Sequence, residues 1–247
     1  MENATLDLDL LQVPEPSVIR EWATERGILI LAHSYQDGFL QEAAHFVGDS
    51  LELARKAAAA DAKSICFCGV HFMAETAKLL CPDAKVFVPD LGAGCSLADS
   101  CKAEDLKQYQ QHLTEKLGQR PTTVAYVNCS AAVKALCDII CTSGNAREVV
   151  ESIPADQPIL FVPDKHLGGW LNETLGREMI LWNGACEVHE LFSVETLNEM
   201  KAEYPAAKVI SHPECPKPVR DASDYVLGTA GMLRLVKESH GETFIIG

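Results

Sequence analysis

The sequence has little basic charge, few aromatic residues and no long apolar run. Its 247 residues contain 21 Lys and Arg against 35 Asp and Glu, which gives a net charge of −14. Proteins bind phosphate backbones through clustered Lys and Arg, so this balance argues against a nucleic acid partner. The sequence has no run of about 18 consecutive apolar residues, so no membrane span is expected. With 47% hydrophobic and 23% charged residues, the composition is typical of a soluble globular protein.

The ten cysteines include no C-x-x-C pair, which removes support for zinc ribbons and thioredoxin-type sites. The opening stretch MENATLDLDLLQVPEP has neither the basic nor the apolar region of a secretory signal. We therefore expect a cytoplasmic protein in a reducing compartment. Its cysteines are then expected to be metal-binding, catalytic or buried rather than disulfide-bonded.

Short β-rich runs alternate with helical segments after a first helix at 15–26, which predicts parallel α/β units. The runs form three sets, and the third is one strand short. We predict three α/β repeats around one site, in domains 1–105, 106–189 and 190–247. The predicted strands are 28–32, 45–47, 64–68 and 85–88; 123–127, 138–141, 159–162 and 179–182; and 208–210, 225–227 and 243–246.

Equal spacings between polar residues support an internal repeat. A residue at or just after the end of the first strand of each set precedes a hydroxyl after the second strand by 17 positions. A cysteine follows small residues after the fourth strand, 45 residues after the first hydroxyl and 43 after the second. A third cysteine is expected at about position 273 by the same spacing. The competing interpretation is that any α/β chain has polar residues after its strands. The pairs are His33 and Ser50, Tyr126 and Ser143, and His212 and Thr229, and the cysteines are Cys95 and Cys186.

The three hydroxyls, on Ser50, Ser143 and Thr229, are expected where strands turn into helices. Exposed N–H groups there bind anions, which suits a substrate with several carboxylate or phosphate groups. The alternative is that each hydroxyl is a plain N-cap.

The stretch 85–99 predicts a buried strand, a small-residue loop and Cys95 at the start of a helix. Cys95 alone fits either a core residue or a ligand. Thiolates on separate loops favour an iron–sulfur cluster over structural zinc, which prefers locally paired cysteines. Three ligands would leave one iron open as a Lewis acid. Candidate acids, bases and hydrogen-bond donors are His33, Tyr35, Tyr126, Asn128, His189, His212 and Glu214.

The motifs AHSYQ, FVGDSLELARKAA, GVHFMAETAKLLCP, VPDLGAGCSLADSC, VPDKHLG, WNGACEVHE and SHPECP closely resemble quinolinate synthase. The resemblance implies pseudo-threefold α/β domains around a [4Fe-4S] cluster. The implied reaction condenses iminosuccinate (iminoaspartate) with dihydroxyacetone phosphate, giving quinolinate, phosphate and two waters. It further implies small anionic substrates and a functional link to L-aspartate oxidase or aspartate dehydrogenase. With the charge and the lack of long apolar runs, no nucleic acid or membrane partner is expected.

Residue by residue, Cys95 and Cys186 match two of the family's three cluster ligands, and the third is expected beyond position 247. Tyr35 and Glu214 match positions implicated in proton transfer. Two alternatives remain: an inactive truncated relative, and an enzyme similar to diphthamide synthase that cleaves S-adenosylmethionine. The other matching active-site and substrate positions are His33, Ser50, Met73, Tyr126, Val127, Asn128, Ser143, His189, His212, Pro213 and Thr229.

Overall fold

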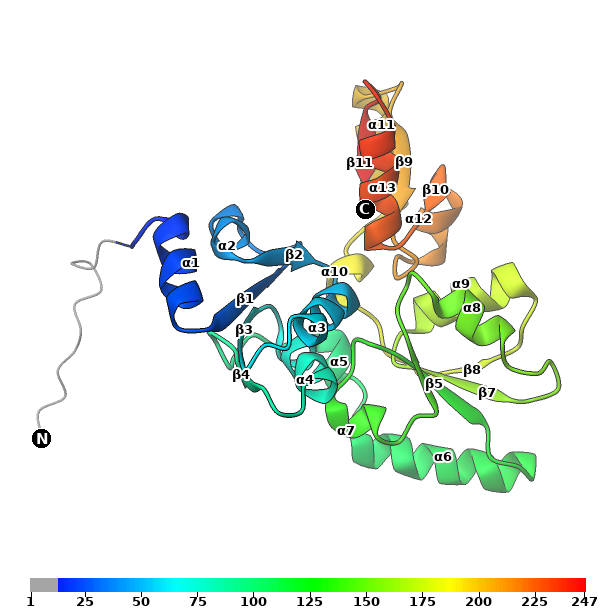
Figure 1. Cartoon of the computed structure of the whole chain (residues 1–247). Helices are drawn as coiled ribbons and strands as arrows, with labels where there is room; N and C mark the ends of the chain where they lie inside the picture. Colours follow the sequence, from blue (N-terminus) through cyan, green and yellow to red (C-terminus); the bar gives the residue numbers. More distant parts are fainter. Residues whose placement is uncertain (1–12) are drawn as a thin grey trace, which may run out of the picture. The chain divides into compact units, whose positions relative to one another are not determined.

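The computed structural model describes residues 13–247, and within them the chain alternates helices with eleven short strands (Figure 1). All eleven strands lie where the sequence predicts them, and no strand end differs from its predicted position by more than one residue. The strands are β1 (Ile28–His33), β2 (Phe46–Gly48), β3 (Ser64–Cys68), β4 (Lys85–Phe87), β5 (Thr122–Tyr126), β6 (Ile139–Cys141), β7 (Ile159–Val162), β8 (Ile180–Leu181), β9 (Lys208–Ser211), β10 (Tyr225–Val226) and β11 (Phe244–Ile246).

Three separate parallel sheets share one strand order. The first is β2-β1-β3-β4, the second is β6-β5-β7-β8, and the third is β10-β9-β11. In each sheet the first strand along the chain is central, and the second and third strands pair on either side of it. The predicted α/β class with three repeated parallel sheets is therefore confirmed, and the third sheet is the smallest.

The register of the first two strands is also identical in the three sheets. Leu31 pairs with Phe46, Val124 with Ile139, and Ile210 with Tyr225, and the partners are 15 residues apart each time. This equal register underlies the 17-residue spacing found in the sequence, because both depend on the length of the helical connection between the strands.

A side-chain hydrogen bond recurs at the same place in each repeat. The residue before the second strand accepts a hydrogen bond from a backbone N–H of the central strand, at 2.8 to 3.0 Å. The acceptors are His45 Nδ1, Asp138 Oδ2 and Asp224 Oδ2, and the donors are the N–H groups of Ile30, Thr123 and Val209. Each bond satisfies an amide of the central strand and fixes where the neighbouring strand begins.

Helices connect the strands, as crossovers between parallel strands require. The longest within residues 13–247, α6 (Ala103–Leu117), connects the first and second repeats, and it ends at Gly118, whose φ of 71° is in the left-handed region. The others are α1 (Pro16–Glu25), α2 (Gly38–Ala43), α3 (Ser50–Ala59), α4 (His71–Leu80), α5 (Ser96–Asp99), α7 (Ala131–Lys134), α8 (Ala146–Glu151), α9 (Lys165–Leu175), α10 (Glu187–Glu190), α11 (Val194–Glu203), α12 (Lys217–Asp221) and α13 (Thr229–Glu238).

The chain divides into two compact units. The first contains residues up to Gly69 together with Ala77–Asp90, and the second contains Val70–Thr76 and Leu91–Gly247. The first unit therefore holds the first sheet, and part of its core joins β1 and β3 to α1. The second unit holds the other two sheets and the larger apolar clusters around β5 and β7. The domain limits at 105 and 189 stay a prediction.

The expectation of a buried strand at the start of the 85–99 stretch is wrong. β4 is at the edge of its sheet, and Phe87 is half exposed. An apolar run of this length fits a buried strand and an edge strand equally well, because burial is decided by which elements cover the sheet. No helix in residues 13–247 has the length and apolar character needed to cross a membrane.

Candidate active site

Two cysteines of the second unit begin short helices that follow small-residue loops. Cys95 is the N-cap of α5, and Cys186 is the N-cap of α10. Both side chains are half-buried free thiols. Burial raises the pKa of each thiol, nearby Glu214 adds to this effect, and backbone N–H groups at the helix starts partly oppose it. The repeated placement predicted from the sequence is thus present in the fold.

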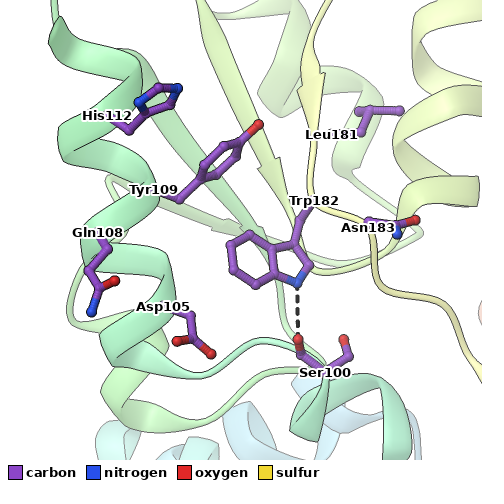
Figure 2. A pocket seen from close by; sticks show the side chains of 8 residues that line it. All are labelled: Ser100, Asp105, Gln108, Tyr109, His112, Leu181, Trp182 and Asn183. Atoms are coloured by element: carbon purple, nitrogen blue, oxygen red, sulfur yellow. Dashed lines mark hydrogen bonds between the residues drawn. The ribbon is translucent and has the colours of Figure 1, made fainter.

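The segments that follow Cys95 and precede Cys186 are joined directly. The indole N–H of Trp182 donates to the carbonyl oxygen of Ser100 at 3.1 Å (Figure 2). Gly184 is buried, and a Cβ there would collide with the Pro163 carbonyl oxygen and the Ser100 hydroxyl. A glycine is required here because two backbones approach closely.

Trp182 also forms a wall of an open cleft of about 690 Å³. The rings of Tyr109 and Trp182 meet edge to face there, with centroids 5.8 Å apart. The cleft contains none of the residues predicted for the site, although Ser100 and Trp182 belong to the motifs VPDLGAGCSLADSC and WNGACEVHE (Figure 2). Its lining residues are Ser100, Asp105, Gln108, Tyr109, His112, Leu181, Trp182 and Asn183.

A hydrogen bond between the second and third sheets connects two predicted residues. Tyr126, the last residue of β5, donates its hydroxyl to Glu214 Oε1 at 2.7 Å. Glu214 lies in the turn after β9 and is only 3% exposed. Burial, together with the negative charge of Asp164, raises the pKa of Glu214 to about 8, and the Tyr126 hydrogen bond opposes part of this shift. Glu214 is therefore largely protonated at neutral pH.

His212 lies beside Glu214 as a neutral imidazole. Its Nδ1 accepts the backbone N–H of Glu214 at 3.3 Å, so its proton is on Nε2, which lies 3.3 Å from Ser143 Oγ. Burial lowers the pKa of His212 to about 3. The 3.3 Å approach of Nδ1 to Glu214 Oε1 is therefore a contact between neutral groups and not an ion pair.

Ser143 also contacts the start of α13. A Cβ on Gly228 would lie 2.5 Å from Ser143 Oγ, so only glycine allows this approach. Thr229 is the next residue and the first of α13. The second and third repeats therefore bring together the three predicted residues Ser143, His212 and Thr229.

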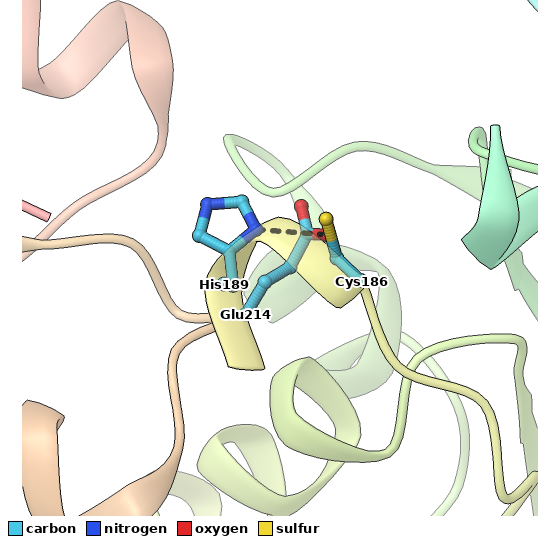
Figure 3. A group of neighbouring side chains, drawn as sticks. All are labelled: Cys186, His189 and Glu214. Carbon is cyan, nitrogen blue, oxygen red and sulfur yellow. Dashed lines mark ion pairs between the residues drawn. The ribbon is translucent and has the colours of Figure 1, made fainter. Parts of the chain in front are cut away.

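His189 places a second imidazole beside Glu214. His189 Nδ1 is 3.7 Å from Glu214 Oε2, and its ring stacks on the ring of His212 with centroids 5.0 Å apart. One ligand atom each of Cys186, His189 and Glu214 lie within 4.8 Å of one another (Figure 3). Burial, and to a smaller extent the charge of His166, lowers the pKa of His189, which favours its neutral, metal-binding form.

The remaining predicted residues of the second unit lie close in sequence to these groups. Val127 and Pro213 are buried, and Asn128 is half-buried in the turn after β5. Met73 is buried in the part of α4 that belongs to the second unit. The same part of α4 is held by Glu75, whose carboxylate accepts the N–H of Ala131 at 2.9 Å.

The first unit contains His33, Tyr35 and Ser50. His33, the last residue of β1, is buried, and its Nδ1 accepts the N–H of Tyr35 at 3.3 Å. The two rings meet edge to face at 4.7 Å. Burial lowers the pKa of His33, and the charge of Asp49 opposes this shift. Ser50 is buried at the start of α3.

None of the three predicted hydroxyls is an N-cap, so that alternative is wrong. Asp49 is the cap of α3, and its carboxylate accepts the N–H groups of Leu51 and Glu52. Asn145 precedes α8, and Gly228 precedes α13 without a side-chain cap. The carboxylate at α3 already occupies amides that an anion would use, whereas the N-cap of α13 is Gly228, which has no side chain to do so.

Asp164 was not predicted as a site residue. It is fully buried beside Gly184, in the loop that precedes Cys186. Its Oδ1 accepts the N–H of Leu167 at 2.6 Å and caps α9, and the Lys165 N–H donates to Gly184 O at 2.8 Å. Burial raises the pKa of Asp164 to about 6. The sequence signals were its place in the VPDKHLG motif and its position after β7, and that position equally fits an ordinary N-cap.

Taken together, the fold and the site define a repeated parallel α/β protein whose strand ends gather thiols, imidazoles and a protonated carboxyl group. Residues 17–247 match the family described as Quinolinate synthetase A protein. The chain belongs to the quinolinate synthase family.

Individual relatives extend this match. The chain is 46% identical over 243 residues to a quinolinate synthase of Synechocystis sp., covering 98% of this chain and 73% of the relative. Over 228 residues it is 48% identical to one of Prochlorococcus marinus, covering 92% of this chain and 67% of the relative. A quinolinate synthase of Chloroherpeton thalassium is 46% identical over 246 residues, covering 100% of this chain and 74% of the relative.

Proposed function

We propose that this protein is a quinolinate synthase of NAD biosynthesis, which condenses iminosuccinate with dihydroxyacetone phosphate and releases phosphate and two waters. The observation that carries the proposal is the polar chain Tyr126–Glu214–His212–Ser143, which lies near Cys186 in a member of this family. Such a reaction needs groups that hold anions and groups that move protons, and these residues offer both.

Cys95 and Cys186 fit a [4Fe-4S] cluster as two of its ligands. They are soft donors on separate helix starts, with free sulfurs and little side-chain bulk before them. A cluster with an open iron supplies a Lewis acid for the elimination of water from a bound substrate. We expect a third thiolate at about position 273, by the spacing of the repeats.

Glu214 is proposed as the group that transfers protons. Its Oε1 accepts the Tyr126 hydroxyl, so its acid proton belongs on Oε2, which has no hydrogen-bond partner in the described part of the chain. A carboxyl group with a pKa of about 8 can give a proton to a departing hydroxyl near neutral pH and regain it afterwards. Tyr35 is proposed as a further proton donor from the first unit.

Neutral donors and helix N–H groups are proposed to bind the substrate carboxylate and phosphate groups. The Nε2–H of His212 and the Ser143 hydroxyl face each other, and each can donate to a carboxylate. The N-terminus of α13, at Thr229, adds backbone N–H groups and a partial positive charge, and its N-cap is Gly228, which has no side chain. Ser50, His33, Asn128, Val127, Met73 and Pro213 complete the proposed substrate-binding set, and His189 the proposed catalytic set.

The test is anaerobic reconstitution with iron and sulfide of the protein expressed to the end of its reading frame. Quinolinate formation is then measured with both substrates. Wild-type protein is expected to form quinolinate, and Glu214→Gln to lose at least about 100-fold in rate, the contribution of a general acid–base group. Cys95→Ser is expected to lose the cluster. Its matched control is Cys129→Ser, which changes a buried thiol that is not a proposed cluster ligand. A reconstituted wild-type protein that forms no quinolinate would overturn the proposal.

A further inference from the structure

Three different donor atoms converge where α10 meets the turn after β9. Cys186 and His189 are three residues apart on one helical turn, and Glu214 approaches from the third repeat. The sulfur, a ring nitrogen and a carboxylate oxygen lie within 4.8 Å of one another. Figure 3 shows the ring of His189 turned toward the Glu214 carboxylate, beside the Cys186 sulfur.

Two of these donors have buried atoms without a partner. Neither His189 Nδ1 nor Glu214 Oε2 makes a hydrogen bond within residues 13–247, although both are buried and only 3.7 Å apart. A buried polar atom left without a hydrogen-bond partner destabilises the fold, so two that face each other call for an explanation. The other oxygen of Glu214 is held by Tyr126 at 2.7 Å, which fixes the carboxylate with Oε2 toward the imidazole.

We propose that Cys186, His189 and Glu214 bind one zinc-like divalent cation when no iron–sulfur cluster is present. A thiolate, an imidazole and a carboxylate are all zinc ligands, and three protein ligands leave a fourth position for water or substrate. The hydrogen bond from Tyr126 orients the carboxylate ligand, as partners behind metal ligands commonly do. Cys186 and His189 are half-buried, so an ion can reach them from solvent.

The site shares Cys186 with the proposed cluster. The Cys186 thiolate is therefore expected to bind either the divalent cation or an iron of the cluster. Zinc is therefore expected to block cluster assembly until it is removed. It would also occupy Glu214, the proposed proton donor. This competition rests on the proposed function, whereas the binding of a single ion does not.

The test uses Co²⁺ as a spectroscopic probe of the zinc site in cluster-free, reduced protein. Wild-type protein is expected to bind one Co²⁺ with a sulfur-to-cobalt charge-transfer band. That band should disappear in Cys186→Ser, and the affinity should fall at least about tenfold in His189→Asn and Glu214→Gln. Cys95→Ser is the matched control, because Cys95 is a proposed cluster ligand outside the three-residue site. It should bind Co²⁺ like wild type.

The two proposals can fail separately. Cys95→Ser should lose the cluster and keep the Co²⁺ site, and His189→Asn should keep the cluster and bind Co²⁺ at least about tenfold more weakly. A cobalt band that needs Cys95, or that survives His189→Asn and Glu214→Gln at full affinity, would overturn the single-ion site and leave the cluster proposal intact. The unfolding midpoint of each variant is measured in parallel, so that a misfolded variant is recognised. If one of the three site variants misfolds, the Co²⁺ affinities of the other two test the proposal.

Discussion

Glu214→Gln is expected to stabilise the cluster-free protein at alkaline pH. Glu214 is buried, and its pKa of about 8 stands above its ordinary value of 4.5. A carboxyl group whose pKa is higher in the folded protein than in the unfolded chain contributes stability that is fully present below pH 4.5. This stability is lost as the pH rises toward 8, because the same carboxyl group ionises at a lower pH in the unfolded chain. Glutamine keeps the shape and the acceptor for Tyr126 and never ionises.

The size of the effect follows from the same pKa values. A pKa difference of one corresponds to 1.36 kcal/mol, so the interval from 4.5 to about 8 corresponds to about 5 kcal/mol. The substitution removes the repulsion from Asp164 together with the ionisable group. The introduced amide group, however, presents N–H donors to the same buried space, which offsets part of the gain. We therefore expect a net gain of about 2 kcal/mol at pH 9 and little change at pH 5.

The assay is urea unfolding of cluster-free, metal-free protein at pH 5 and pH 9, followed by far-ultraviolet circular dichroism. Glu190→Gln is the matched control, because hydrogen bonds from His166 and Lys165 lower the pKa of Glu190, so it gains nothing at pH 9. Comparing variants cancels the titration of all other groups. If wild type and Glu214→Gln lose stability in parallel between pH 5 and pH 9, the buried protonated carboxyl group does not exist.

Two further substitutions test the junction between the cysteine-bearing segments. Gly184→Ala should destabilise the protein by about 2 kcal/mol or more by overpacking against Pro163 and Ser100, whereas Gly169→Ala, at a helical position with open space, should be neutral or slightly stabilising in the same thermal unfolding assay. Trp182→Phe keeps most of the ring and removes the hydrogen bond to Ser100, so the free energy of unfolding should fall by about 1 kcal/mol; an unchanged value would show that this bond contributes nothing to the junction.

Much of the fold could be read from the sequence because its local patterns repeat. The 15-residue register of β1 with β2 recurs at β5 with β6 and at β9 with β10, and it follows from connections of equal length. Spacing of this kind is visible along the chain. The exposure of Phe87 was not, because it depends on the edge position of β4 in the sheet.

The candidate site was only partly predictable for the same physical reason. Cys95 and Cys186 could be placed at helix starts because each follows small residues after a strand. The contact of Tyr126 with Glu214 spans 88 positions and joins two sheets, so no local pattern encodes it. The protonation of Glu214 depends on burial that only the folded chain creates.

The most direct test of the central claim is the iron and sulfide content of anaerobically prepared protein, expressed to the end of its reading frame. We expect about four irons and about four sulfides per chain in wild type and in Cys129→Ser, and no bound iron in Cys95→Ser. An unchanged iron content in Cys95→Ser, or a wild-type protein that binds no iron while remaining folded, would contradict it.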